Sequence, residues 1–196
     1  MADEITLAVQ RMNYYKTLAL AFSYPDKNVL AMFPDFLSER ENLQAEYDRL
    51  FRASEVWLYT TEYSISSEFQ RTKALADIMG FYRAFGVGPD KDRPDALANE
   101  LEFMYYLVFK SLYAFKNGRD EAADEKARLC LDAQKKFFNE YLYPGARQIA
   151  EKVAGLSGHK FYLQMSRELL DFLEEENKVF GVGGAINPVS MEKITR

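Results

Sequence analysis

The residue types that carry most enzymatic chemistry are scarce in this chain. It holds one histidine, His159, and one cysteine, Cys130, in 196 residues. Zinc sites and nucleophilic centres usually draw on several such side chains, so neither kind of site is expected. His159 stands at a predicted helix start as a capping or surface residue, and Cys130 is expected to be a small buried hydrophobe. The sequence therefore predicts no catalytic residue, no metal ligand and no bound cofactor.

Two glycine-rich segments, residues 86–88 and 181–184, have a superficial likeness to phosphate-binding loops. A P-loop continues into Lys-Ser or Lys-Thr, and a dinucleotide fingerprint follows a strand. Neither segment has such a context. Both are predicted to terminate helices instead.

Carboxylates are the most frequent reactive groups, with 30 Asp and Glu residues. Asp95 and Glu102 are seven residues apart, about two helical turns, so they could share an acidic rim that receives a basic peptide. A merely solvated face is the alternative. Glu100 and Glu102 should point to different sides of the helix, and residues 174–176 are predicted to be a solvated helix end.

Composition narrows the class of protein and of partner. The chain is 48% hydrophobic and 28% charged, which is typical of a globular protein, and its few glycines and prolines favour helices. A net charge of −5 without a basic stripe argues against nucleic acid as a partner. The sequence has no apolar run of membrane-spanning length and no signal peptide, so we expect no membrane span and a cytoplasmic protein.

Apolar residues recur at helical spacing along most of the chain, which predicts an all-α fold: a single globular bundle of about eight or more helices. A hinge loop is expected near residues 86–94, between an N-lobe at about 1–88 and a C-lobe at about 93–180, with a tail at 181–196. Residues 56–65 are aromatic and β-branched but have no partner run, so an ordered loop is expected there. The helices are expected at about 5–22, 27–33, 38–51, 67–85, 94–117, 120–141, from 144, and 161–176.

Three stretches in matching order resemble the TorD/DmsD/NarJ family of molybdoenzyme-specific chaperones. Residues 46–51 (EYDRLF) are similar to an acidic-x-x-x-Leu-Phe element, and residues 93–104 (RPDALANELEFM) resemble the family signature of Pro-Asp-His followed by Glu-Leu-Glu-Phe-Met. The third is residues 159–162 with the leucine-rich helix after them. Residues 58–63 and 76–86 look most like the branch that serves selenate and chlorate reductases, dimethylsulfide dehydrogenase and ethylbenzene dehydrogenase.

The resemblance implies a function that the composition alone does not. Such chaperones hold the apo catalytic subunit of a molybdoenzyme, often through its twin-arginine leader, until the molybdenum cofactor is inserted. It also implies an all-helical fold and a monomer or homodimer. The family histidine is Ala96 here, so a recognition step that needs an imidazole at this position is in doubt.

A twin-arginine leader combines an arginine pair with an apolar stretch, which suggests two groups of partner-binding residues. Carboxylates suit arginine, so Asp95, Glu102 and Glu62 are candidate partners of the arginine pair, and we expect Asp95 to face outward. An aromatic groove would suit the apolar stretch, although ordinary core packing is the alternative. The aromatic candidates are Trp57, Tyr59, Tyr63 and Tyr82. A helical scaffold or regulatory protein-binding module remains the alternative function.

Overall fold

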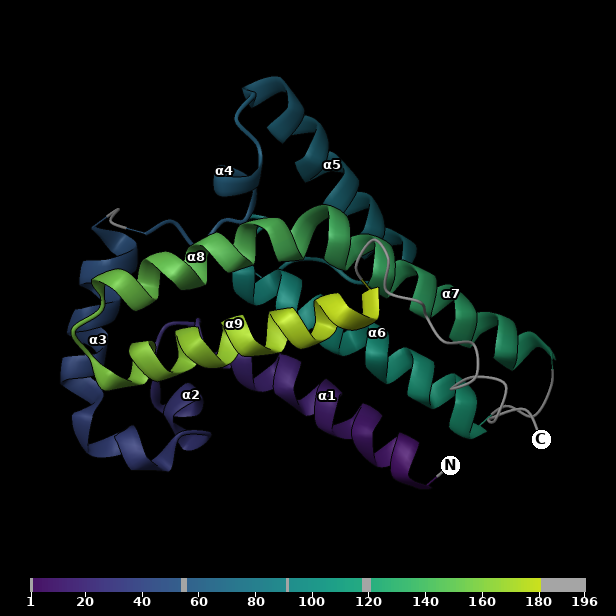
Figure 1. The fold of residues 1–196 in the computed structure, drawn as a ribbon, viewed down its shortest axis with the longest axis horizontal. Helices are drawn as coiled ribbons and strands as arrows, with labels where there is room; N and C mark the ends of the chain where they lie inside the picture. Colours follow the sequence, from purple (N-terminus) through teal and green to yellow (C-terminus); the bar gives the residue numbers. More distant parts are fainter. Residues whose placement is uncertain (1, 54–55, 91, 118–120, 181–196) are drawn as a thin grey trace.

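A computed structural model describes residues 2–53, 56–90, 92–117 and 121–180, and it confirms the all-α bundle (Figure 1). The chain opens with α1 (Ala2–Ala21), which packs along α6 and α9. The short helix α2 (Lys27–Ala31) follows. Its N-cap is Asp26, whose carboxylate accepts the backbone N–H groups of Asn28 and Val29 at 2.7 and 2.9 Å.

The first resemblance motif lies at the end of α3 (Arg40–Tyr47), which follows a 3₁₀ turn and leads into a π turn at Asp48–Arg52. Glu46 accepts bonds from Arg49, from the Ser157 hydroxyl and from the Gly158 N–H. The bond from Arg49 is the main reason that the pKa of the Glu46 carboxyl falls to about 2. Glu46 thereby ties α3 to the connection between the last two helices.

Residues 56–65 form the ordered loop that the sequence predicts, and one backbone bridge fixes this loop to a distant segment. Tyr59 forms an isolated antiparallel bridge with Ala96, because the Thr60 N–H donates to the Asp95 carbonyl at 3.0 Å and the Leu97 N–H donates to the Leu58 carbonyl at 2.8 Å. The chain then forms one helical turn, α4 (Thr61–Ser64). This bridge holds the aromatic loop against the residues just before α6.

The expected break follows α5 (Glu68–Ala84), which starts at the Ser67 cap and projects from the body of the bundle (Figure 1). Gly86 has a φ of 75°, a left-handed conformation that favours glycine and stops the helix. None of the residues described between Gly86 and Leu97, where α6 begins, is helical. Hinge motion at this loop, and the division into two lobes, stay predictions.

The C-terminal half supplies the long helices of the bundle. α6 (Leu97–Asn117) lies beside α7 (Glu121–Phe137), and a π turn at Phe138–Leu142 leads into α8 (Tyr143–Leu156), which packs along α9 (Lys160–Phe180). The α6 stripe predicted from periodicity is buried at its N-terminal end, where four of its residues are at most 2% exposed. Those residues are Leu97, Leu101, Met104 and Val108.

The prediction that residues 174–176 are a solvated helix end is wrong for Glu176. Its carboxylate is 4% exposed and receives two bonds of 2.6 Å from the Arg11 guanidinium, together with the Tyr15 hydroxyl. Arg11 also donates to Gln134 at 2.8 Å. This cluster joins α1, α7 and α9. Its partners lie up to 165 residues apart in the sequence, so local periodicity could not reveal it.

Two further predictions concern the C-terminal tail and the possibility of a membrane span. The predicted tail, residues 181–196, lies outside the described residues. Within the described ranges, no helix combines the length and the apolar character that crossing a bilayer requires.

Candidate functional site

The signature segment places Asp95 inside the protein. Its carboxylate is 0% exposed, and both of its oxygens are bound. Arg93 donates to them at 2.9 and 2.8 Å, and the Thr61 hydroxyl donates at 2.5 Å. The expectation that Asp95 faces outward is therefore wrong. A spacing of seven residues places two side chains on one face only if both belong to the same helix. Asp95 precedes the first residue of α6, so Asp95 and Glu102 do not form a shared acidic rim.

Glu62 belongs to the same arrangement. One of its oxygens pairs with Arg93 at 2.8 Å and the other pairs with Arg71 at 2.9 Å. The Arg93 guanidinium also lies 4.3 Å from the centre of the Tyr59 ring. Carboxylates and an aromatic face thus surround an arginine, as expected for a client, but the arginine is the chain's own. We call Glu62, Thr61, Arg93 and Asp95 the signature cluster.

Thr60 connects the signature cluster to a second buried carboxyl. Its hydroxyl donates to Glu100 at 2.9 Å, while the other Glu100 oxygen is buried without a hydrogen-bond partner. Burial, with a smaller contribution from the charge of Asp95, raises the pKa of the Glu100 carboxyl well above its ordinary value. Glu100 and Glu102 do point to different sides: Glu100 is fully buried and the Glu102 side chain is 41% exposed.

Close packing fixes Thr60 from the other side as well. Gly145, in the first turn of α8, lies so near that an added Cβ would be 2.3 Å from the Thr60 carbonyl oxygen. A side chain at this position would push α8 away from the loop. The bridge to Ala96, the Glu100 carboxyl and Gly145 therefore hold Thr60 in one place.

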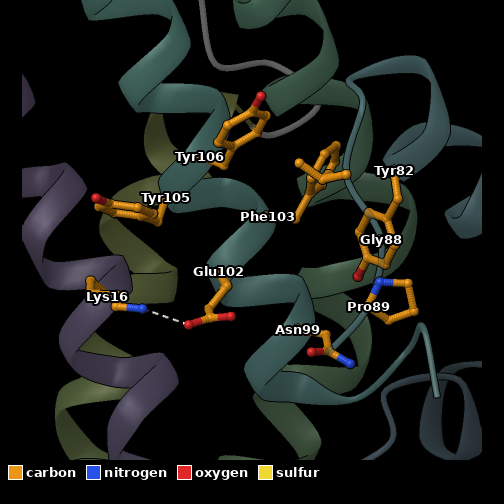
Figure 2. A pocket seen from close by; sticks show the side chains of 10 residues that line it. Lys16, Tyr82, Gly88, Pro89, Asn99, Glu102, Phe103, Tyr105 and Tyr106 are labelled. Atoms are coloured by element: carbon orange, nitrogen blue, oxygen red, sulfur yellow. Dashed lines mark hydrogen bonds and ion pairs between the residues drawn. The ribbon is translucent and has the colours of Figure 1, made fainter. Parts of the chain in front are cut away.

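A cavity of about 230 Å³ opens beside α6, which we call the Glu102 cavity. Figure 2 shows Glu102 reaching from α6 toward Lys16 on α1, with Tyr82 and Pro89 across the cavity. The Lys16 ammonium and the Glu102 carboxylate lie 2.6 Å apart, and both side chains are about two-fifths exposed. Tyr82 donates its hydroxyl to the Pro94 carbonyl at 2.6 Å. Two of the predicted binding residues, Glu102 and Tyr82, thus line one cavity.

The predicted aromatic residues do not form a single groove. Trp57 is 49% exposed and its ring centre lies 6.2 Å from that of Tyr59. Tyr63 is partly buried and accepts the Trp57 backbone N–H at 2.8 Å. Tyr82 is 2% exposed and packs against Phe103. Trp57 and Tyr59 therefore form an outer pair, while Tyr82 is a core residue with one edge on the Glu102 cavity.

Comparisons with known proteins show the family of the chain. The family model for the nitrate reductase delta subunit matches residues 22–150, which include the signature cluster and all of α6. The chain belongs to this family. The expected resemblance is thereby confirmed at the level of the family, and the match extends from the end of α1 into α8.

Two relatives of the chain are named as assembly chaperones. The chlorate reductase assembly chaperone protein of Ideonella dechloratans is 34% identical over 118 residues, and the selenate reductase assembly chaperone protein of Thauera selenatis is 30% identical over 118 residues. Each match covers 54% of this chain and 60% of the relative. Both relatives serve enzymes of the branch that the sequence suggested.

Sequence reasoning missed several residues that shape the site. Arg93 was part of the quoted motif and of the expected hinge loop but was given no role, because its contacts depend on Glu62, which lies 31 residues earlier. No sequence pattern indicated that Lys16 belongs to the site, because its partner Glu102 is 86 residues away. Among the described residues, no group of three or more His, Cys, Asp or Glu side chains could hold a metal ion.

Proposed function

We propose that this protein is a cytoplasmic assembly chaperone that binds the apo catalytic subunit of a molybdenum-cofactor enzyme until the cofactor is inserted. The main support is the family match across the signature segment, together with relatives that are named as reductase assembly chaperones. Under this proposal the protein acts by binding and not by catalysis. A single histidine and a single cysteine suit that role.

The client arginine is proposed to bind Glu102. The Lys16–Glu102 pair is well exposed, and such pairs are worth only about 0–1 kcal/mol, so a competing cation can displace Lys16 at little cost. Arginine gains over lysine here because its guanidinium can donate two parallel bonds to one carboxylate. Asp95 and Glu62 are proposed to act as positioning residues, since Arg93 already binds both.

The apolar stretch of the client has two candidate contacts beside Glu102. Tyr82 and Tyr105 line the Glu102 cavity itself. Trp57 and Tyr59 present partly exposed rings, and the Tyr59 hydroxyl bonds to Asp92 in the loop whose Pro89 lines the cavity. Tyr63 supports this outer pair through its bond to the Trp57 backbone.

The first test is calorimetric titration with the leader peptide of the candidate client. Glu102→Gln is expected to weaken binding at least tenfold, about 1.4 kcal/mol, while Lys16→Gln tightens it by removing the competing cation. Glu68→Gln, an exposed glutamate on α5, is the matched control. Unchanged affinity of Glu102→Gln would remove Glu102 from the binding surface.

The second test concerns maturation. A pull-down from cells blocked in molybdenum-cofactor synthesis is expected to recover more catalytic subunit than one from normal cells, because the apo form accumulates. Equal recovery from both would favour the alternative function, a helical scaffold or regulatory module that takes no part in cofactor insertion.

A further inference from the structure

A second groove lies on a different part of the molecule, where the end of α5, the C-terminal half of α6 and the N-terminal half of α7 meet. It encloses about 580 Å³. Figure 1 shows α6 and α7 running together away from the centre of the bundle. We call this the α6–α7 groove. It shares no lining residue with the Glu102 cavity.

Small side chains and large apolar ones both line the α6–α7 groove. Ala84, Ala114 and Ala122, one from each of the three helices, line it. Tyr113 and Leu129 rise beside them and remain 59% and 61% exposed. Small residues allow another backbone to approach closely, and large exposed apolar side chains offer contact area. The shape suits a helix that inserts its apolar face.

The charged residues that line the α6–α7 groove are both lysines. Lys110 and Lys126 form no ion pair with any carboxylate of the described residues. The Lys110 ammonium does lie 5.5 Å from the centre of the Tyr106 ring. Two cations that line the same groove, in a chain of net charge −5, are complementary in charge to a partner segment that carries carboxylates.

We infer that the α6–α7 groove binds an acidic amphipathic helix of a partner protein. The apolar face of that helix packs against the alanines, Tyr113 and Leu129 of the groove, and its flanking carboxylates pair with Lys110 and Lys126. Helix-in-groove binding uses apolar anchors at successive turns of this kind. The partner surface is opposite in charge to the cationic segment proposed for the Glu102 cavity, so one chaperone could hold two segments at once.

The probe is a labelled synthetic helix of about 15 residues, roughly four turns, with leucine on one face and glutamate on its flanks. Its counterpart carries lysine in place of glutamate. Fluorescence anisotropy with the full chain measures affinity. Cys130 lines the groove and is the only cysteine of the chain, so its rate of reaction with a thiol reagent reports occupancy at this place.

The acidic helix is expected to bind and to slow the reaction of Cys130, whereas the basic counterpart does neither. Charge reversal by Lys110→Glu with Lys126→Glu is expected to weaken binding at least tenfold. Lys27→Glu with Lys73→Glu makes the same change in net charge at exposed positions elsewhere and should leave it unchanged. Leader binding at Glu102 serves as a folding control for both double variants.

Three results would overturn the proposal. The first is equal binding of the basic helix, and the second is an affinity that the Lys110 and Lys126 reversal does not change. The third is competition by a synthetic copy of residues 181–196 as strong as that of the acidic helix, which would make the chain's own C-terminal segment the occupant.

Discussion

Charged side chains are paired with each other in the signature cluster, whereas the charged side chains of the α6–α7 groove have no carboxylate partner among the described residues. Asp95 and Glu62 are bound by the chain's own arginines, and Asp95 is fully enclosed. Lys110 and Lys126 line an apolar groove without a carboxylate partner among the described residues. A residue that matches a family motif can thus serve the fold, whereas the binding proposed for the α6–α7 groove rests on lysines that have no carboxylate partner among the described residues. Four measurements test that distinction.

The largest effect is expected at the signature cluster. Asp95→Asn keeps the size of the side chain but removes its charge, leaving Arg93 with only Glu62 as an acidic partner. Breaking a buried pair in this way costs roughly 3 kcal/mol of unfolding free energy. Urea denaturation measures it, and Asp90→Asn, an exposed change in the same loop, is the control. A loss below about 0.5 kcal/mol, within the usual range for surface changes, would mean that the cluster is not structural.

The second effect tests how firmly the cluster is held by its neighbours. Gly145→Ala places a methyl group 2.3 Å from the Thr60 carbonyl oxygen, so α8 or the loop must shift. Overpacking of this kind typically costs about 1–3 kcal/mol. Gly155→Ala, later in the same helix, meets nothing within 4 Å and should be neutral or slightly stabilising. Equal melting temperatures for the two variants would contradict the close approach.

The third measurement uses pH. Because the folded state raises the pKa of Glu100, the unfolded chain releases this proton first as pH rises past about 4.5. Between that value and the raised pKa the folded state binds more protons, so the contribution of Glu100 to stability falls with increasing pH. Glu100→Gln removes this fall.

The unfolding free energy of Glu100→Gln, relative to that of the original protein, should therefore be higher at pH 7.5 than at pH 5. Denaturation curves recorded at both pH values measure it. Glu41→Gln, an exposed glutamate of α3, is the control. A difference between Glu100→Gln and the original protein that does not change with pH would show that Glu100 is already ionised in the fold.

The smallest effect is expected at the α6–α7 groove. Lys110→Gln and Lys126→Gln break no ion pair with a carboxylate of the described residues, so each should change unfolding free energy by less than about 0.5 kcal/mol. The same denaturation assay measures both. A loss as large as that of Asp95→Asn would mean that these lysines serve the fold, and the contrast between the two regions would disappear.

Local sequence patterns predicted the helices but not the contacts between the helices. The periodicity of α6 and the proline and glycine boundaries of α1 and α5 were sufficient, because burial repeats every three to four residues within one helix. Asp95 was misplaced because a residue just before a helix does not follow the helix's face. Glu176 was misread since an acidic run usually faces solvent, and only a distant arginine reverses that preference.

The same limit applies to the binding residues. The motif located the region of the Glu102 cavity, since Tyr82 and Glu102 both line it. It could not reveal that Arg93 occupies the arginine site of the signature cluster, because that depends on the bridge between Tyr59 and Ala96. Lys110 and Lys126 lie on different helices, so their shared groove required the packed structure.

The Arg11–Glu176 pair has a consequence for biosynthesis. Arg11 is synthesised 165 residues before its partner, an interval of roughly ten to thirty seconds at ordinary rates of translation. During that time α1 can dock on α6 but lacks its final ion pair, and Tyr15 has no carboxylate to receive its hydroxyl. The ion pair that fixes α1 to α9 therefore forms only after α9 has been synthesised, although α1 can pack on α6 much earlier.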